Sequence, residues 1–219
     1  MQSHLEQCRH NMVEQQVRPW DVLDDKVLNT LEMIPRDRFV PVQYSNLAYA
    51  DTAIPLTENA RMMHPILEGR LLQLLNIQPE DNVLEIGTGS GYLTACLATL
   101  ACHVETYEID ESLAAKAKQT LQDQGIFNID IICADGLQGT SVNKKYDVIV
   151  LTGSVSEAPD TFLQALNSNG RLFVITGEAP AMQARVLTRT TDNDWADEVI
   201  FETVLPRLVN GEKPASFTF

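Results

Sequence analysis

Three glycines alternate with a threonine and a serine along residues 87–91, directly after a short apolar segment that contains a carboxylate. The apolar segment, residues 83–86, has the composition of a buried parallel strand, and residues 92–100 continue as an apolar helix. Glycines let the backbone turn tightly and approach a ligand closely. A glycine-rich turn between strand and helix is the usual entrance to a nucleotide pocket at the carboxyl edge of a parallel sheet. The candidate ligand-binding residues of this turn are Glu85, Gly87, Thr88, Gly89, Ser90 and Gly91.

The spacing of the glycines separates two kinds of nucleotide. A dinucleotide fingerprint places its third glycine three residues after the second, but Tyr92 occupies that position here. Glu85, just before the turn, is placed to accept hydrogen bonds from the turn itself or from a ligand ammonium group. These differences favour S-adenosylmethionine (SAM), whose amino-acid tail is zwitterionic and which has no pyrophosphate, over NAD. A glycine-rich turn with no ligand is the other alternative.

Two further acidic residues stand where such a pocket needs them. Glu108, with Ile109 beside it, lies about twenty residues beyond the glycines in a predicted strand at residues 103–110, a position suited to accepting both ribose hydroxyls. Asp135 and Gly136 follow the predicted third strand. The carboxylate there suits the adenine amine, and the glycine leaves room for the ring. A solvated glutamate and a simple Asp-Gly turn are the alternatives.

Strand and helix signals alternate between residues 82 and 176. Thr152 stands at the carboxyl end of a predicted fourth strand and joins the cofactor-binding candidates, and an Asn169-Gly170 turn leads into the fifth strand. This alternation predicts a doubly wound α/β fold. The order of motifs resembles class I SAM-dependent methyltransferases, whose Rossmann-like fold implies a mostly parallel seven-stranded sheet with helices on both faces. The remaining predicted segments are strands at 129–133 and 146–151, and helices around Lys116 and Leu121 and at 157–166.

The composition argues against several classes of function. With 16 basic and 30 acidic residues, the 219-residue chain has a net charge of −14, which disfavours binding to nucleic acid or to an anionic membrane surface. No apolar run is long enough to cross a bilayer, and the polar N-terminus lacks a secretory core. The four cysteines lack metal-ligand spacing, so we expect no metal site, and we expect Cys96 and Cys133 to be buried. We expect a reducing, cytoplasmic location.

The N-terminal third has a different pattern. Residues 3–17 read as an amphipathic helix, and residues 26–34 as a second helix that Asp24 or Asp25 caps and that ends before Pro35. No linker sets this part apart from the α/β pattern. The helices are therefore expected to pack over the carboxyl edge of the sheet.

The length suits a single domain with a substantial core. We predict that residues 1–219 form one domain. Within it, residues 1–80 form a helical cover with an active-site loop, and residues 81–219 form the SAM-binding core.

Several motifs carry a more specific resemblance. The N-terminal motifs and the glycine turn together resemble protein-L-isoaspartate O-methyltransferases, over about residues 8 to 177. That family uses SAM, releases S-adenosylhomocysteine, and methylates the free α-carboxylate of isoaspartyl residues in damaged proteins. The resemblance therefore implies a protein or peptide substrate that carries a carboxylate acceptor. The motifs are Met12-Val13-x-x-Gln16, Pro35-Arg36-x-x-Phe39-Val40-Pro41, Ala48-Tyr49-x-Asp51, Ile54-Pro55 and Glu85-Ile86-Gly87-Thr88-Gly89-Ser90-Gly91-Tyr92.

The chain departs from this family in one loop. The family carries Thr-Ile-Ser-x-Pro, whereas this sequence reads Arg61-Met62-Met63-His64-Pro65. Met63 replaces the functional serine, and its thioether cannot donate a hydrogen bond. Arg61 can hold a carboxylate with two parallel hydrogen bonds, as the expected permanent cation among the nearby loop residues, and His64 can assist. The alternatives are a solvated arginine, a packing or capping histidine, and a methionine that only lines the pocket. A C-terminal extension, residues 211–219, is a second departure.

The expected chemistry places modest demands on side chains. A carboxylate acceptor is already ionised at neutral pH, so no general base is required. The protein must position the acceptor and exclude water. Three hypotheses follow: methyl transfer to an isoaspartyl or similar carboxylate, methyl transfer to a small molecule or another protein group, and SAM binding without catalysis. The sequence does not specify the oligomeric state.

Overall fold

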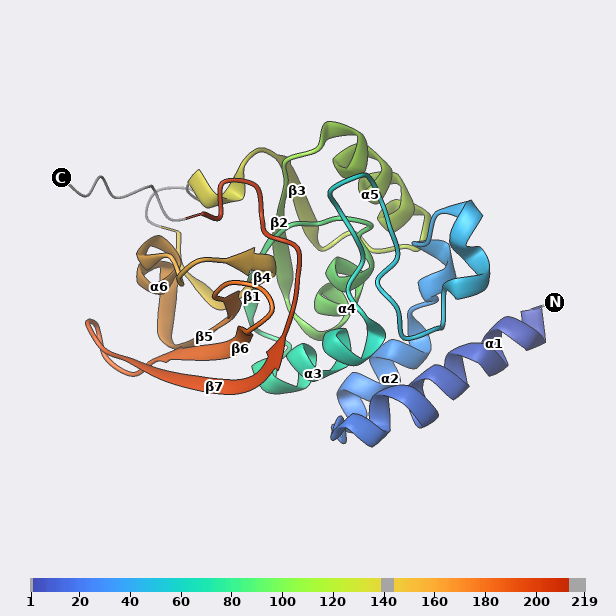
Figure 1. Ribbon diagram of the computed structural model, residues 1–219, viewed down its shortest axis with the longest axis horizontal. Coiled ribbons are helices and arrows are strands. Elements are labelled where there is room, and N and C mark those ends of the chain that lie inside the picture. The colour runs from blue at the N-terminus through green and yellow to red at the C-terminus, as the bar shows by residue number, and fades with distance from the viewer. Residues whose placement is uncertain (1, 139–143, 213–219) are drawn as a thin grey trace.

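A computed structural model describes residues 2–138 and 144–212 of the chain. Seven strands form one sheet in the order β3-β2-β1-β4-β5-β6-β7, as Figure 1 shows. The first five strands run parallel, and β6 and β7 add to one edge in antiparallel fashion. The mostly parallel sheet confirms the predicted fold class. The strands are β1 Asn82–Ile86, β2 His103–Glu108, β3 Ile129–Cys133, β4 Tyr146–Val155, β5 Leu166–Thr176, β6 Met182–Arg189 and β7 Trp195–Thr203.

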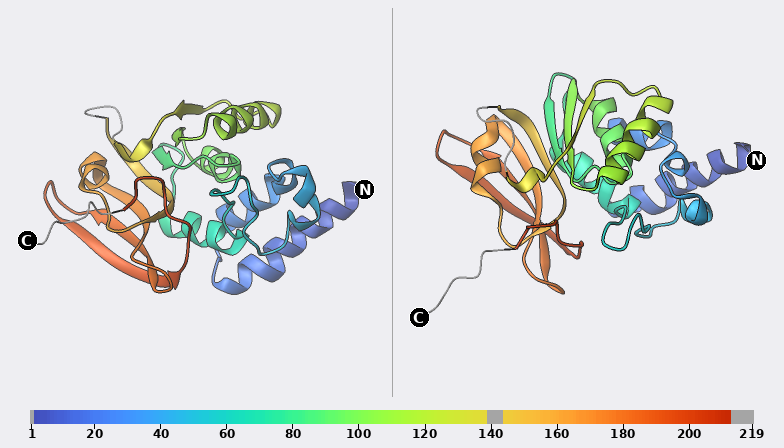
Figure 2. Two further views of the ribbon diagram at one scale, coloured as in Figure 1. Left: turned by 45° about the horizontal axis from the view of Figure 1, so that its top comes forward. Right: turned by 90° about the horizontal axis from the view of Figure 1, so that it is seen from above.

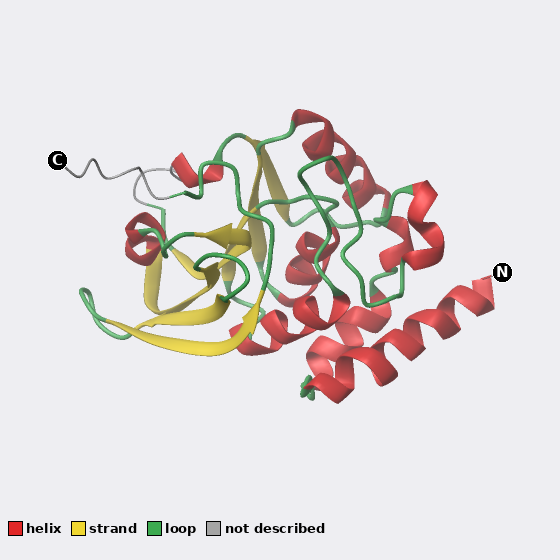
Figure 3. Cartoon of the chain, in the orientation of Figure 1, coloured by secondary structure: helices red, strands yellow, loops and turns green. Residues whose placement is uncertain are grey.

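Helices precede and connect these strands (Figure 3). The α-helices are α1 Gln2–Asn11, α2 Asp25–Met33, α3 Pro65–Leu75, α4 Tyr92–Leu100, α5 Glu111–Asp123 and α6 Asp160–Ala165. A π-helical turn covers Met12–Val17, and short 3₁₀ turns cover Arg18–Trp20, Arg36–Arg38, Val42–Leu47 and Gly136–Gln138. Among the described residues, no helix has the length and apolar character needed to span a membrane.

The strands divide the interior into two apolar clusters. Val83 faces a cluster that includes residues of α2, α3 and α4, whereas its neighbour Leu84 faces the cluster that contains Phe162 of α6. This alternation follows from the two-residue period of a strand. Both further views place α1–α4 on one side of the sheet and α6 on the other (Figure 2). The N-terminal helices therefore share their core with the sheet and with α4.

The first predicted helix changes its geometry midway. The α-helical part ends at Asn11, and the π turn that follows brings Met12, Val13 and Val17 into the core, where all three are completely buried. A π turn inserts one residue per turn and so rotates the side chains that follow it. The second predicted helix forms as expected: Asp24 caps α2 by accepting a hydrogen bond from the Lys26 amide at 2.8 Å.

Three local predictions are wrong. Helix α6 begins only after Pro159, at Asp160, and it ends at Ala165 because Leu166 already belongs to β5 and pairs with Tyr146. Asn169-Gly170 consequently lies within β5, where Asn169 adopts a positive φ of 61°. Cys133 is exposed because it ends β3, the edge strand, whereas Cys96 is buried as predicted. Most of the C-terminal extension, residues 213–219, lies outside the described residues.

Candidate active site

A cavity opens at the carboxyl ends of β1, β2 and β4 and, with its mouth, encloses about 1150 Å³. The walls come from the glycine turn, the 53–64 loop and a C-terminal segment at residues 204–209. Twelve of the fourteen predicted site residues line it: Arg61, Met63, His64, Gly87, Thr88, Gly89, Ser90, Glu108, Ile109, Asp135, Gly136 and Thr152.

The glycine turn is shaped by its backbone. Gly87, Gly89 and Gly91 have positive φ values of 101°, 56° and 85°, which side chains disfavour. A Cβ atom added at Gly87 would lie 2.2 Å from the Thr152 hydroxyl, so this position also excludes a side chain sterically. The Gly87 amide donates to the Tyr107 carbonyl at 2.8 Å, which fixes the turn to the end of β2.

Glu108 links the glycine turn to the end of β2. One of its oxygens accepts a hydrogen bond from the Gly89 amide at 2.8 Å, and the other accepts from the Asp110 amide at 3.0 Å. The side chain is 7 % exposed and lies in the cavity wall. These two bonds hold a carboxylate, whose oxygens have further acceptor capacity, at a fixed position in that wall.

Asp135 also has two partners, one of which the sequence did not reveal. Its Oδ1 accepts from the Leu137 amide at 3.0 Å, and its Oδ2 accepts from Asn210 Nδ2 at 2.7 Å. Asn210 lies 75 residues further along the chain, so no local pattern connects the two. A Cβ atom at Gly136 would lie 2.8 Å from Ile86 and Tyr107 side-chain atoms, which explains this glycine by packing.

Two predicted ligand contacts, Glu85 and Gly91, do not line the cavity. Glu85 is completely buried, and its Oε2 accepts hydrogen bonds from the hydroxyls of Thr94 at 2.5 Å and Thr106 at 2.7 Å. Among the described residues, Oε1 has no hydrogen-bond partner. Burial raises the pKa of Glu85 to about 8, although the two threonine hydroxyls oppose the rise. Gly91 precedes α4 and packs against Leu121. Both residues support the turn from behind.

The 53–64 loop forms a tight hairpin. Pro55 and Arg61 form an antiparallel bridge, and the Met62 amide donates to the Ile54 carbonyl at 2.8 Å. Met62 and Met63 are both 5 % exposed and line the cavity, whereas Arg61 is exposed. The methionines therefore supply an apolar wall, and the arginine lies at its solvent-facing edge.

A buried arginine from the N-terminal part contacts this loop. Arg36 is completely buried; its Nη2 donates to the Met63 carbonyl at 2.7 Å, and its Nη1 pairs with Glu68 of α3. The guanidinium carbon lies 4.7 Å from the centroid of the Tyr92 ring. Glu68 itself lines the cavity. Sequence reasoning placed Arg36 in a family motif but assigned no role to it, and it missed Glu68.

His64 stands between the loop and α3. Its Nδ1 lies 3.4 Å from Asp51 Oδ2, and Asp51 Oδ1 accepts from the Ile66 amide at 3.2 Å. Asp51 thus satisfies a free amide in the first turn of α3 and orients the imidazole at the same time. The histidine is half-buried and borders the cavity.

The C-terminal segment 204–209 forms the opposite wall, which the sequence did not predict. Its backbone pairs with β4: the Ser154 amide donates to the Pro206 carbonyl, and the Leu208 amide donates to the Ser154 carbonyl, both at 2.9 Å. Arg207 lines the cavity, donates to the Ser156 hydroxyl at 2.7 Å and forms an ion pair with Glu178 at 2.7 Å. A second permanent cation, from a segment outside the loop that carries Arg61, therefore borders the cavity. Among the described residues, no cluster of three or more His, Cys, Asp or Glu side chains is arranged to hold a metal ion.

Comparisons with known proteins agree with this geometry. A family model described as Protein-L-isoaspartate(D-aspartate) O-methyltransferase matches residues 7–210. A protein-L-isoaspartate O-methyltransferase of Aliivibrio fischeri is 34% identical over 204 residues, which cover 93% of this chain and 97% of the relative. One from Gloeobacter violaceus is 37% identical over 180 residues, covering 82% of this chain and 88% of the relative.

Solved structures share the fold. A Plasmodium falciparum structure described as a protein-L-isoaspartate O-methyltransferase, in complex with S-adenosyl-L-homocysteine, superposes with a TM-score of 0.81 and covers 92% of this chain and 98% of its own. Its sequence identity to this chain is 21%.

Proposed function

Since the chain belongs to the protein-L-isoaspartate O-methyltransferase family, we propose that its cavity transfers a methyl group from SAM to the free α-carboxylate of an isoaspartyl residue in a protein or peptide. The observation that carries this proposal is the arrangement of one wall. There the glycine turn, the Glu108 carboxylate and the Asp135 carboxylate line one cavity at the carboxyl edge of the sheet. In an open α/β sheet, that edge is where nucleotide ligands bind.

The residues present fit SAM. The glycines of the turn have no side chains that would block the close approach of a ligand. A Cβ atom at Gly89 would lie 3.3 Å from the Leu56 side chain, so a side chain there would narrow the space. Glu108 supplies an acceptor for ribose hydroxyls, and Asp135 supplies one for the adenine amine. The spacing of the glycines, with Tyr92 at the position of the third glycine of a dinucleotide fingerprint, disfavours NAD.

The proposed cofactor contacts are the cavity-lining members of the sequence prediction. They are Gly87, Thr88, Gly89, Ser90, Glu108, Ile109, Asp135, Gly136 and Thr152. Among them, Thr152 donates to the Gly87 carbonyl at 2.8 Å, so its hydroxyl serves the turn, and its role toward the ligand is to shape the wall.

The chemistry divides between cofactor and protein. When bound, SAM supplies an electrophilic methyl group on a sulfonium that is also the leaving group. Met62 and Met63 exclude water from the place where the acceptor reacts, which raises the nucleophilicity of a carboxylate. Arg61 and Arg207 offset the negative charge of the protein at the mouth and attract an anionic acceptor. His64 borders the cavity with its Nδ1 3.4 Å from Asp51 Oδ2, so we assign it to packing and hydrogen bonding with the acceptor.

The direct test measures transfer of a labelled methyl group from SAM to an isoaspartyl peptide. A peptide of the same sequence with an ordinary aspartyl residue is the matched control. The proposal predicts a base-labile methyl ester on the isoaspartyl peptide alone. Calorimetry with SAM, S-adenosylhomocysteine and NAD measures the cofactor end separately, and tight binding of NAD without SAM would contradict the assignment.

Met63 favours a second candidate. A loop that lacks the hydroxyl of the family's serine also suits a methyl acceptor that needs no hydrogen-bond donor at this point. Methyl transfer into proteins or small molecules of a cell extract, without transfer to the isoaspartyl peptide, would identify this alternative. SAM binding without any transfer would instead indicate a non-catalytic SAM-binding protein.

A further inference from the structure

Arg36 lies where three segments that follow it in the sequence come together. It belongs to the 3₁₀ turn Arg36–Arg38, and it contacts the 53–64 loop, helix α3 and the first residue of α4. We propose that Arg36 is a positioning residue for the methyl acceptor, acting through the backbone of the 53–64 loop. This inference rests on the proposed function, because that function makes the loop a wall of the acceptor site.

Arg36 contacts the 53–64 loop at Met63, near the C-terminal end of the loop. Arg36 Nη2 donates to the carbonyl of Met63, the residue that stands at the family's serine position. On the other side of the hairpin, the Met62 amide donates to Ile54. The backbone is therefore held on both sides of the Met62–Met63 pair, at the Met62 amide by Ile54 and at the Met63 carbonyl by Arg36. A carbonyl held in this way fixes where the Met63 side chain enters the cavity.

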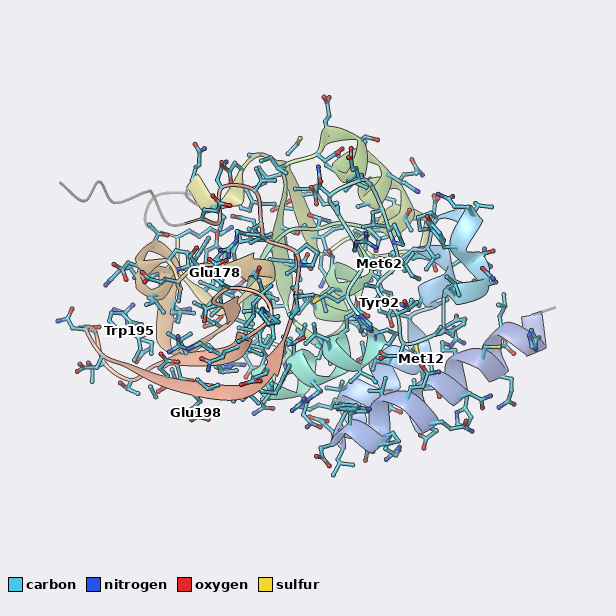
Figure 4. The ribbon with its side chains drawn as sticks, viewed as in Figure 1. Met12, Met62, Tyr92, Glu178, Trp195 and Glu198 are labelled. Atoms are coloured by element: carbon cyan, nitrogen blue, oxygen red, sulfur yellow. The ribbon has the colours of Figure 1, made fainter. Side chains whose placement is uncertain are left out.

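The ion pair with Glu68 explains why a buried arginine is tolerated at position 36. A completely buried guanidinium needs compensation, and Glu68 supplies it from α3. The Tyr92 ring, whose residue is labelled in Figure 4, adds a cation–π contact, with its centroid 4.7 Å from the guanidinium carbon. Charge compensation engages Nη1, so Nη2 is available for the loop carbonyl. The two prongs of one planar fork thus have different tasks, one electrostatic and one geometric.

The cofactor turn is held by other bonds. The Gly87 amide donates to Tyr107, and the Gly89 amide donates to Glu108, both at 2.8 Å and neither involving Arg36. Arg36 reaches this region only through the face of the Tyr92 ring. A substitution at Arg36 should therefore impair use of the peptide and leave cofactor binding nearly unchanged. If Arg36 served overall stability alone, the substitution would impair both equally.

Arg36→Lys is the sharpest variant. Lysine keeps the positive charge that Glu68 needs, but a compact ammonium cannot reproduce the planar fork that reaches both Glu68 and the Met63 carbonyl. Arg38→Lys is the matched control, because Arg38 lies in the same turn and its side chain is 66 % exposed. A second variant, Arg36→Met with Glu68→Leu, removes both charges together and so avoids an unpaired buried ion if the lysine variant is unstable.

Three measurements decide the proposal. Steady-state kinetics with the isoaspartyl peptide should show that Arg36→Lys raises the peptide KM or lowers kcat/KM by roughly tenfold to a hundredfold, as expected for a misplaced acceptor. The affinity for S-adenosylhomocysteine should change by less than about threefold. Amide hydrogen exchange in the protein without peptide should show faster exchange at Met62 and unchanged exchange at Gly89. The control and wild type should match in every measurement, and the double variant should reproduce the peptide defect.

Other outcomes overturn the proposal. Equal losses of peptide and cofactor binding, with faster exchange throughout, would assign Arg36 to stability alone. Unchanged exchange at Met62 in both Arg36 variants would remove the link to the loop. If the wild-type protein does not methylate the isoaspartyl peptide, the proposed function fails, but the exchange comparison still tests whether Arg36 holds the loop.

Discussion

The two ends of the cavity are built in different ways. At the cofactor end, positive-φ glycines and the termini of β1 and β2 form the wall, and their hydrogen bonds join elements that are adjacent in one sheet. At the acceptor end, the 53–64 loop is held by Arg36, which is compensated by Glu68. The first arrangement depends on backbone geometry, and the second depends on a buried ion pair.

This difference has an energetic consequence. Backbone hydrogen bonds within a sheet remain satisfied when surface side chains change, whereas a buried ion pair becomes costly as soon as one partner is lost. The stability of the cofactor end should therefore depend little on its surface side chains. The acceptor end should respond strongly to changes at residues that never touch a substrate.

We expect the largest effect at the acceptor end, on the free energy of unfolding. Glu68→Ala leaves the Arg36 guanidinium buried without its partner, and removing one member of a buried pair costs about 3–5 kcal/mol. Denaturant unfolding measures this loss. The control Glu58→Ala changes an exposed residue of the 53–64 loop and should stay within about 0.5 kcal/mol of wild type. A loss for Glu68→Ala no larger than that of the control would show that the pair contributes little.

At the cofactor end, the free energy of unfolding measured across a pH series tests the burial of Glu85. Burial raises the pKa of Glu85 from 4.5 to about 8, so the folded state holds a proton that the unfolded state releases between these values. Stability should therefore fall as pH rises through this window, by about 1.4 kcal/mol per pH unit for this one group. Glu85→Gln cannot ionise, and the difference between the two unfolding free energies should grow in its favour from pH 5 to pH 7. Parallel curves would mean that Glu85 is ionised in the folded protein.

A substitution at Glu108 tests the cofactor end through the affinity for SAM. Glu108→Ala removes a charged acceptor from the proposed ribose site, a loss worth roughly 1.5–3 kcal/mol, or about tenfold to a hundredfold in SAM affinity. Calorimetry with S-adenosylhomocysteine measures it. The KM for the isoaspartyl peptide should change little. An unchanged cofactor affinity would move the ribose contact to another residue.

The smallest effect concerns the exposed charge at the cavity mouth. Arg61→Ala should lower kcat/KM for the isoaspartyl peptide by about two- to fivefold, because exposed charge pairs contribute little. Arg61→Lys should restore part of the loss, and the effect should shrink as salt screens the attraction. Kinetics across a salt series, with Arg38→Ala as control, would test this. A loss that is independent of salt would contradict an electrostatic role.

The cofactor end was largely predictable from the sequence. Its signals are local: a glycine turn after an apolar strand, and acids that follow the next two strands. The carboxyl ends of parallel strands meet at one edge of the sheet, so the sequence pattern alone predicts that Glu108 and Asp135 lie in the same pocket. Glu85 was misjudged because a periodic pattern does not show whether a carboxylate at a strand end faces the ligand or the hydroxyls of Thr94 and Thr106.

The acceptor end was predictable only in part. The departure at Met63 and Arg61 was visible in the loop sequence. The contact between Arg36 and Glu68 spans 32 residues, and the link between Asn210 and Asp135 spans 75. Such contacts arise from packing between elements, and neither spacing nor composition encodes them locally. The second cation, Arg207, escaped prediction for the same reason.

The most direct test of this division of labour is a grid of initial methyl-transfer rates over SAM and isoaspartyl peptide concentrations, for wild type and Met63→Ser. The serine restores the family's hydroxyl at the acceptor end and leaves the glycine turn, Glu108 and Asp135 unchanged. The account predicts methyl transfer to the isoaspartyl peptide, a higher kcat/KM for that peptide in Met63→Ser, and the same KM for SAM in both proteins. A changed KM for SAM with no gain on the peptide, or no transfer to the peptide by either protein, would contradict it.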